Sequence, residues 1–451
     1  MNKKLVAVAV AGMLAAPLAA QAQTANVTLY GRVHLDMEVI KAQQDTTQNP
    51  GNTGTDGNAT KQNIFRVVSN SSRLGVRGSE ALGGGLSAIF QIESAVSAAN
   101  GGGLGSTLGT RETFVGLQGG WGTVKLGYFL TPYDDIHPIF GNVPTLATSI
   151  LGTQALWSNT GWAGNYQYGG AFDDRAANSI RYDSPNIAGF TGSVQIGSAT
   201  AGGDPTNGPQ AITTGITATG TPAGTTVAQQ RRHAYLLSLN GLYNNGPFQA
   251  GIAYEVHNNF RNNSTPVAGT AFAGQTNPDT NRISGLRLQD EGLSIAASWN
   301  FGVAKVGGVF EQLKYDAATG GNFKRNFWGA SLTWNLGPGQ LYAMYGNAGN
   351  GTGSAADYQQ VGAVRKGSNT GAQQWEVSYT YALSKRTLLQ AGYVQIANRS
   401  NGAYNFGVNQ AVGACGLSNT GQVSPGTGVT SSGCGNSAKP QGLIFGLVHF
   451  F

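Results

Sequence analysis

Apolar and polar side chains alternate one by one along most of the chain beyond residue 26. The segment "NVTLYGRVHLD" (26–36) puts Val27, Leu29, Val33 and Leu35 on one side, and Thr28, Tyr30, Arg32, His34 and Asp36 on the other. The same period of two runs through residues 189–197, 291–302 and 372–383. Neighbouring side chains of an extended strand point to opposite faces, so this period is typical of β-strands. The pattern predicts an all-β protein.

A soluble β-sandwich would show the same alternation, so the period alone does not decide the architecture. The strands are long enough to cross a bilayer, where a tilted strand needs about 9–11 residues. Aromatic side chains, such as Tyr379 and Tyr381, gather near strand ends. Aromatic rings at strand ends are typical of the interfacial girdles of transmembrane barrels. These features favour a membrane-spanning barrel.

The connections between the strands alternate between long and short. The short turns include residues 81–85, 118–122, 184–189, 244–247 and 336–340. The long polar stretches lie near residues 41–61, 100–109, 130–176, 200–230, 259–289, 316–323, 350–370 and 399–439. Eight long and seven short connections predict sixteen antiparallel strands, with both chain ends on the short-turn side.

The last strand, "GLIFGLVHFF" (442–451), stays apolar on one side to its final residue. In a closed barrel this strand pairs with the first, because no strand edge can stay unpaired in hydrocarbon. Phe451 is then expected to face lipid near the interface. Ile444 and Val448 break the pattern, since they point to the opposite side, and we expect them to pack against the first strand or an inward loop.

The first 22 residues have the features of a secretory signal. Lys3 and Lys4 precede a short apolar run, and Ala20-Gln21-Ala22 supplies a small-residue cleavage pattern. A membrane-anchor helix is the alternative. Cleavage after Ala22 leaves residues 23–451 as one barrel domain, in which no run of about 18 apolar residues predicts a spanning helix.

The charge of the chain is low and only mildly positive. Charged residues make up 11% of the sequence, about half of what a soluble domain carries. Without Lys3 and Lys4 the count is 25 basic against 21 acidic residues, a net charge of +4. This excess is too weak to predict a nucleic-acid partner.

The two cysteines lie close together in a Gly/Ser/Thr-rich stretch near the C-terminus. In an exported protein, Cys415 and Cys434 are expected to form a disulfide that closes a surface loop. Two free thiols are the alternative, and a zinc site lacks further ligands nearby.

The sequence carries no pattern of an enzyme. The five histidines, His34, His137, His233, His257 and His449, are scattered, and no nucleophile elbow, zinc-protease motif or phosphate-binding glycine loop is present. We therefore expect no catalytic residues, no cofactor and no metal.

Four segments, together with the closing "GLVHFF", resemble the general porins of Gram-negative bacteria, and their beta-proteobacterial branch most of all. They are "VTLYGRVHLD" (27–36), "SSRLGVRGSEALGGGL" (71–86), "RETFVGLQGGWGTVKLGY" (111–128) and "NSIRYDSPNIAGFTGSV" (178–194). The resemblance implies a homotrimer of sixteen-stranded barrels in the outer membrane, each with a water-filled pore. It also implies that the third long connection, about residues 131–177, folds inward and narrows the pore.

The resemblance further implies a pore constriction with basic side chains on the wall and acidic ones on the loop. The matching wall residues are Arg32, Arg73, Arg77 and Arg181. The acids of the loop are Asp134, Asp135, Asp173 and Asp174. The alternation of side chains supports a lumen-facing position for these arginines, since an Arg on the lipid face costs about 2–4 kcal/mol near the midplane. The alternative for each Arg is a rim or interface residue in a structural ion pair.

Two positions depart from the family pattern. Gly127-Tyr128 replaces the Gly-Arg of many members, and the loop segment 138–142 lacks the Glu of enteric relatives. Which of the remaining loop acids reaches the constriction stays open, as does the facing of Arg111 and Lys125.

We expect passive diffusion of small hydrophilic solutes and ions through the pore, with a mild anion preference. A solute-specific channel on the same barrel is the alternative, and the external loops could also serve in adhesion. The expected surroundings are outer-membrane lipid and lipopolysaccharide.

Overall fold

The structure is a computed structural model that describes a defined part of the chain. The described residues are 26–42, 62–99, 108–141, 149–158, 172–200, 211–213, 226–228, 235–258, 288–317, 320–361, 363–402, 404–406 and 437–451. The expected signal segment (1–22), Cys415 and Cys434 lie outside these ranges. In the part described, no helix is both long and apolar enough to cross a membrane.

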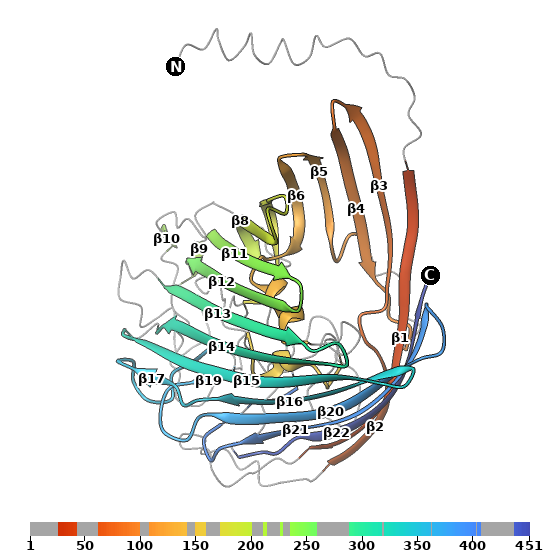
Figure 1. Ribbon diagram of the computed structural model, residues 1–451. Coiled ribbons are helices and arrows are strands. Elements are labelled where there is room, and N and C mark those ends of the chain that lie inside the picture. Colours follow the sequence, from red (N-terminus) through yellow and green to blue (C-terminus); the bar gives the residue numbers. More distant parts are fainter. Residues whose placement is uncertain are drawn as a thin grey trace.

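Antiparallel strands follow one another in chain order around a single curved sheet (Figure 1). The first half contains β1 (Asn26–Ala42), β2 (Gln62–Ser69), β3 (Arg73–Gly83), β4 (Leu86–Ala95), β5 (Thr113–Gly119), β6 (Gly122–Leu130), β7 (Arg175–Asp183) and β8 (Phe190–Thr200). The second half contains β11 (Tyr235–Asn245), β12 (Phe248–Asn258), β13 (Gln289–Asn300), β14 (Ala304–Asp316), β15 (Asn322–Leu336), β16 (Gly339–Ala348), β20 (Ala372–Ala382), β21 (Thr387–Asn398) and β22 (Gln441–Phe450).

Short elements lie in the connections. They are the 3₁₀ helices η1 (Asp134–Phe140) and η2 (Thr153–Ala155), and the strands β9 (Ala211–Thr213), β10 (Thr226–Ala228), β17 (Thr352–Gly353), β18 (Gln360–Val361) and β19 (Val364–Arg365).

Sixteen strands build the barrel, as the connection lengths predict. The sheet has 18 members because it includes the two-residue β17 and because β2 and β3 are two parts of one bent strand. Both parts pair with β1, and the break between them lies at 70–72, where Ser71 has a φ of 51°. An extra residue that bends a strand without ending its pairing is a β-bulge.

The barrel closes between its first and last strands. β1 pairs with β22 from Arg32 opposite Phe450 to Lys41 opposite Gln441. The backbone of Phe451 also exchanges hydrogen bonds with Gly31, at 3.0 and 3.1 Å. The terminal strand therefore has no free edge, and the expected pairing of the two chain ends is confirmed.

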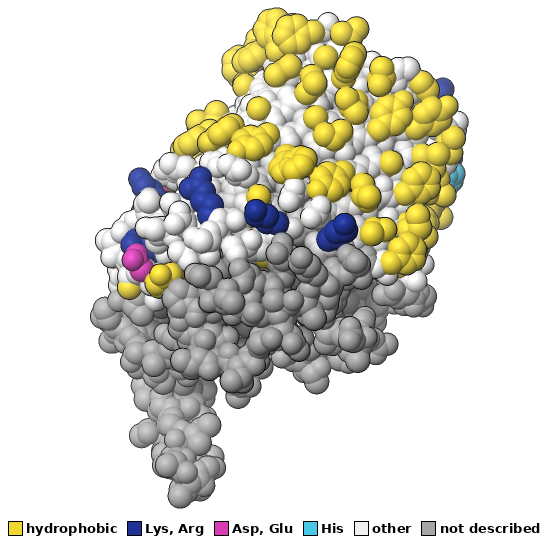
Figure 2. Space-filling model, turned by 90° about the horizontal axis from the view of Figure 1, so that it is seen from below, with side chains coloured by type: hydrophobic (Ala, Val, Ile, Leu, Met, Phe, Trp, Pro, Cys, Tyr) yellow, Lys and Arg dark blue, Asp and Glu magenta, His cyan; other side chains and the backbone are white. Residues whose placement is uncertain are grey.

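The outer face of the sheet is apolar, as the alternation predicts. Among the strands read from the sequence, Val27, Leu29, Phe190, Ile295 and Phe445 are all exposed. Figure 2 shows hydrophobic side chains over a broad area of this surface. Near the short turns the rings of Phe190, Tyr243, Phe248, Trp299 and Phe301 follow one another in contact across neighbouring strands. This row corresponds to an interfacial aromatic girdle.

Ile444, which points away from the lipid side of β22, is buried in an apolar cluster. The same cluster includes Ile150 and Leu151 from the connection between β6 and β7. Ile150 also lies against Gly442 of β22. Ile40 of β1 belongs to the same cluster, so Ile444 is buried among side chains of both expected partners, the first strand and the connection.

Candidate functional site

The connection between β6 and β7 is the longest described feature that does not belong to the sheet. β7 begins at Arg175, so this connection ends at residue 174, slightly earlier than expected from the sequence. Its described segments are 131–141, 149–158 and 172–174. They contact strands far along the chain, and these contacts define a candidate site.

Glycines on the buried face of the sheet make room for the connection. A Cβ atom at Gly251 would lie 2.7 Å from Ile139, and one at Gly292 would lie 2.7 Å from Phe172. Gly329 lies beside Phe140, and Gly392 beside Leu151, in the same way. Cβ atoms rarely approach other atoms this closely, so a larger residue at these positions would require side chains of the connection to shift.

A fully buried ion pair on β14 and β15 holds two segments of the connection. Arg325 Nη2 lies 3.1 Å from Glu311 Oε2, and neither side chain is exposed. Glu311 Oε1 accepts hydrogen bonds from the hydroxyl of Tyr133 (2.9 Å) and the backbone N–H of Ser158 (2.8 Å). Arg325 also donates to the carbonyl of Leu156. A buried pair needs such additional hydrogen bonds to offset desolvation.

Further hydrogen bonds extend this attachment across the sheet. Trp157 Nε1 donates to Ser294 Oγ of β13 at 3.0 Å. Lys305 Nζ of β14 donates to the carbonyl of Pro138 at 3.1 Å, and Gln374 Nε2 of β20 donates to that of Gly152 at 3.0 Å. The connection is therefore attached to strands from β13 to β20 as well as to its own neighbours.

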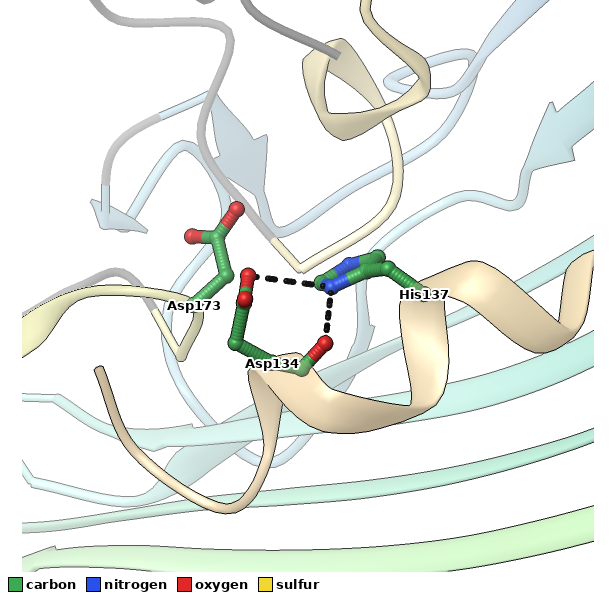
Figure 3. Close-up of side chains that lie close together, drawn as sticks. All are labelled: Asp134, His137 and Asp173. Atoms are coloured by element: carbon green, nitrogen blue, oxygen red, sulfur yellow. Dashed lines mark hydrogen bonds and ion pairs between the residues drawn. The ribbon is translucent and has the colours of Figure 1, made fainter. Parts of the chain in front are cut away.

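The two ends of the connection meet in a cluster of Asp134, His137 and Asp173 (Figure 3). His137 Nδ1 lies 2.9 Å from the carbonyl of Asp134 and 3.1 Å from its carboxylate. His137 Nε2 lies 3.0 Å from Ser158 Oγ. Asp134, His137 and Asp173 are residue types that bind metals, but both imidazole nitrogens already have protein partners. The geometry fits an imidazolium held by Asp134, with Asp173 nearby, better than a metal site.

The local environment shifts the pKa values of this cluster. Burial lowers the pKa of His137, but the hydrogen bonds and charge of Asp134, with the charge of Asp173, outweigh it and raise the pKa to about 9. Burial raises the pKa of Asp173 well above its usual range, although His137 opposes this. Burial likewise raises the pKa of Asp174, to about 6. Near neutral pH, His137 therefore carries a positive charge.

Arg181 and Asp135, both expected at the constriction, contact each other directly. Arg181 Nη2 lies 2.5 Å from Asp135 Oδ2, and Arg181 Nε lies 2.7 Å from Asp183 on the same strand. Asn240 Nδ2 of β11 donates to the same Asp135 oxygen at 2.8 Å. Arg181 thus sits in a structural ion pair, the alternative considered for each wall arginine, while still joining the wall to the loop.

The remaining wall arginines lie on β1 and β3, near Glu93 of β4. Arg73 Nε lies 3.6 Å from Glu93, and Arg111 Nε lies 2.7 Å from it. Arg32 is buried, and its Nε donates to the carbonyl of Ser71 at 3.1 Å. Arg77 is exposed, with its guanidinium 4.9 Å from the ring centre of Tyr30. Arg73 and Arg111 thus place two positive charges beside the carboxylate of Glu93.

Seven of the eight predicted site residues therefore fall into three groups, and Asp174 lies outside them. Arg181 pairs with Asp135, and Asp134 gathers with Asp173 around His137. The three arginines of β1 and β3 lie apart from these pairs. Asp174 Oδ1 accepts the backbone N–H of Arg175 at 2.7 Å.

Several charged residues of this region were not singled out from the sequence, such as Arg175, whose Nε lies 3.2 Å from Glu112. Lys125, whose facing the sequence left open, has its Nζ 2.9 Å from Asp183. Glu93 follows the lipid-facing Ile92 on β4, so the alternation of side chains assigns Glu93 to the inner face. The sequence could therefore have identified Glu93 as a residue of the inner wall. No local signal identifies Glu311 or Arg325 as partners of the connection, because their contacts span more than a hundred residues.

A closed sheet of sixteen antiparallel strands, apolar outside and polar or charged inside, defines the class of outer-membrane β-barrels. Within this class, residues 7–401 match the Gram-negative porin family. Outer membrane porin protein 32 of Delftia acidovorans is 31% identical over 88% of this chain and 90% of its own length. The chain therefore belongs to the Gram-negative porin family, and it is an outer-membrane protein.

Other relatives and structures agree with this assignment. The major outer membrane protein P.IA of Neisseria meningitidis serogroup C is 36% identical over 44% of this chain, and the match spans 46% of that relative's length. The anion-selective porin from Comamonas acidovorans has a TM-score of 0.61 at 22% identity, covering 95% of this chain and all of that one. The trimer form of OmpT from Vibrio cholerae has a TM-score of 0.54 at 13% identity, covering 95% of this chain and 99% of that one. These two structural likenesses concern the fold alone.

Proposed function

We propose that this porin is a water-filled channel for passive diffusion of small hydrophilic solutes and ions. The observation that carries the proposal is the closed barrel whose polar and charged side chains face away from the lipid side. Such an interior suits hydrated solutes and offers nothing to couple transport to energy. Family membership supports the same function.

The connection of residues 131–174 is proposed to fold into the barrel and narrow the channel. Its contacts with the buried faces of β12, β13 and β15, through Gly251, Gly292 and Gly329, support this arrangement. The Glu311–Arg325 ion pair would hold the loop against one side. The open path for solutes would then run between the loop and the opposite wall, where Arg73 and Arg77 lie.

Arg73 and Arg77 are proposed as the basic side of the constriction, and they favour a mild anion preference. Both side chains are at least partly exposed, whereas Arg32 and Arg181 are buried and held by protein partners. A few fixed charges in a pore with low-dielectric walls bias the entry of ions. The name of the Comamonas structure, an anion-selective porin, agrees with this preference. Asp134 and Asp135, which pair with His137 and Arg181, remain the proposed loop acids of the constriction.

Further features of the working protein are also proposals. They are export with cleavage after Ala22, a disulfide between Cys415 and Cys434, assembly into a homotrimer, contact with lipopolysaccharide, and the absence of enzymatic activity. The trimer form known for the OmpT structure supports the trimer. Cysteine pairs are common in exported proteins, which supports the disulfide.

Conductance across a planar bilayer tests this function. The purified protein should insert in groups of three equal steps, and a salt gradient should give a reversal potential of the sign that anions produce. A bilayer without steps would refute the channel, and a clear cation preference would refute only the charge assignment. Saturable block by one class of solute would favour a solute-specific channel on the same barrel.

A further inference from the structure

A buried cluster of polar side chains lies on the inner face of the barrel where the first and last strands meet. His34 and Asp36 are on β1 and Gln390 is on β21, with β22 between these two strands (Figure 1). None of the three residues is more than 1% exposed. Asp36 and Gln390 both lie opposite Gly446 of β22, where a Cβ atom would collide with the Asp36 carboxylate. The glycine therefore lets side chains from two non-neighbouring strands meet.

Three atoms of this cluster converge. His34 Nε2 lies 3.1 Å from Asp36 Oδ1, and Gln390 Nε2 lies 2.6 Å from the imidazole nitrogen and 2.7 Å from the carboxylate oxygen. The other oxygen of Asp36 accepts a hydrogen bond from Asn70 Nδ2, which fixes the carboxylate. Among the described residues, His34 Nδ1 and Gln390 Oε1 have no hydrogen-bond partner, although both are buried. Each corner of the triangle is thus within hydrogen-bond distance of the other two.

Hydrogen bonds alone do not satisfy this triangle. A neutral imidazole carries a single N–H. If the hydrogen is on Nε2 of His34 and points to Asp36, this N–H meets the N–H groups of Gln390 at 2.6 Å. If the hydrogen is on Nδ1, Nε2 accepts from Gln390, but its lone pair then faces the Asp36 carboxylate and the Nδ1–H is buried without an acceptor. Either arrangement leaves an unfavourable contact.

Rotation of the Gln390 amide by 180° exchanges its oxygen and nitrogen but does not remove the conflict. The amide oxygen then lies where the nitrogen was, 2.7 Å from the Asp36 oxygen, so that two acceptors face each other. A cation bound to all three corners removes every one of these contacts, because it accepts the lone pairs of one nitrogen and two oxygens. Ligands of four- and six-coordinate ions with bonds of about 2.1 Å lie about 3.0–3.4 Å apart. The triangle therefore needs to open by only a few tenths of an ångström.

His34 differs in this respect from His137. Both ring nitrogens of His137 have protein partners outside the carboxylates' competition, since one lies beside the Asp134 carbonyl and the other beside Ser158 Oγ. The ring of His34 directs Nε2 at a carboxylate and an amide together, while Nδ1 has no partner among the described residues. His34 is therefore the histidine whose surroundings suit a metal ion.

We propose that His34, Asp36 and Gln390 bind a divalent transition-metal ion, which ties β1 to β21 across the last strand. The ligands are Nε2 of His34, Oδ1 of Asp36 and Oε1 of Gln390, and Asn70 orients the carboxylate. One imidazole nitrogen with two oxygens suits Zn²⁺ or Co²⁺ better than Mg²⁺ or Ca²⁺, which prefer oxygen alone. No sequence motif joins the three ligands, since Gln390 follows Asp36 by 354 residues. The site belongs to the barrel wall and does not depend on the channel function.

Metal analysis of the folded full-length protein in detergent tests the site. After incubation with Zn²⁺ and removal of the excess, wild type should retain one Zn²⁺ per chain. Co²⁺ should bind in its place and give a visible absorption band, and a large excess of Mg²⁺ or Ca²⁺ should not compete. The temperature of unfolding should rise with Zn²⁺, because the ion binds only the closed barrel. Wild type that retains no stoichiometric Zn²⁺, or that prefers Ca²⁺, would overturn the proposal.

The variant Gln390→Glu distinguishes a metal site from a hydrogen-bond network. A second carboxylate beside Asp36 should strengthen Zn²⁺ binding, whereas in a network without metal it would only add repulsion. This variant should therefore unfold at a lower temperature than wild type without Zn²⁺ and regain stability when Zn²⁺ is added. Unchanged Zn²⁺ affinity, or no recovery of stability, would overturn the assignment of Gln390 as a ligand.

His34→Ala should lose the stoichiometric Zn²⁺. His449→Ala removes an exposed histidine on β22 and is the matched control, which should bind Zn²⁺ like wild type. The double variant Cys415→Ser, Cys434→Ser should also bind like wild type, which excludes the thiols as ligands. Zn²⁺ retained by His34→Ala, or lost by either control, would place the ion elsewhere and overturn the site. Wild type and Gln390→Glu decide the question even where His34→Ala fails to fold.

Discussion

The two sides of the barrel interior differ although one alternating pattern encodes both. On β1, β3 and β4, Arg32, Arg73 and Glu93 form a charged surface on which Arg73 remains partly exposed. On β12–β15 and β20–β22, the positions of the same parity include a buried apolar cluster that also contains Ile139 and Leu151 of the β6–β7 connection. A strand in a barrel specifies only which side chains point inward. Whether these side chains contact water or protein depends on the position of a segment that is distant in the chain.

The largest effect should follow from breaking the Glu311–Arg325 pair. Glu311→Ala leaves Arg325 buried without its counterion and removes the acceptor for Tyr133 and Ser158, which should cost about 3–5 kcal/mol. The loop should detach from its side, giving larger and noisier single-channel conductance and a lower melting temperature. The double variant Glu311→Leu, Arg325→Met should recover part of the stability. Wild-type conductance in Glu311→Ala would show that the pair does not position the loop.

Substitution of a glycine beside the β6–β7 connection should have the next largest effect. Gly292→Val places side-chain atoms where the ring of Phe172 lies, since even a Cβ there would approach it to 2.7 Å. Overpacking of this kind costs about 1–3 kcal/mol. Gly308→Val, whose Cβ would lie 3.9 Å from the nearest atom and points outward, is the control. Changed conductance in Gly292→Val alone supports the seating of the loop, and equal behaviour of both variants would contradict it.

On β3, removal of positive charge should change the ion selectivity but not the stability of the protein. Arg73→Gln with Arg77→Gln should shift the reversal potential in a salt gradient toward cations, reducing the anion-to-cation permeability ratio roughly twofold. The melting temperature should stay close to wild type because both side chains are at least partly exposed. Lys385→Gln with Arg386→Gln, which removes two charges at an exposed short turn, provides a charge-matched control outside the pore. An unchanged reversal potential would remove these arginines from the constriction.

The smallest effect should come from titration of His137. Its pKa in the folded protein, about 9, lies above the ordinary value near 6.5. The stabilisation from its protonated form is thus fully present below about pH 6.5 and is lost as the pH rises through 9. Channel noise should increase between pH 7 and 10 in wild type, and this increase should be smaller in His137→Gln. The same pH response in both proteins would exclude His137 as its source.

The sequence by itself determined the strands, their facing and the closure of the barrel. Side chains such as Val27, Ile295 and Phe445 follow a period of two that needs only local geometry and an apolar surrounding. The alternating lengths of the connections likewise gave the strand number and the side on which the termini lie. Both signals are local, because the alternation within each strand shows which of its faces is apolar.

The tertiary structure alone decided how the inner surface is used. In β15, Phe323, Arg325 and Phe327 all point inward while Lys324 and Asn326 point outward, so apolar character does not mark the lipid side there. Arg325 has its partners at Leu156 and Glu311, and Arg181 has one at Asp135. The contacts of Arg325 with Leu156 and of Arg181 with Asp135 join segments distant in the chain, whereas Glu311 lies on the strand that precedes Arg325. No local period encodes them, because a buried charge is stabilised only by the particular groups that folding brings beside it.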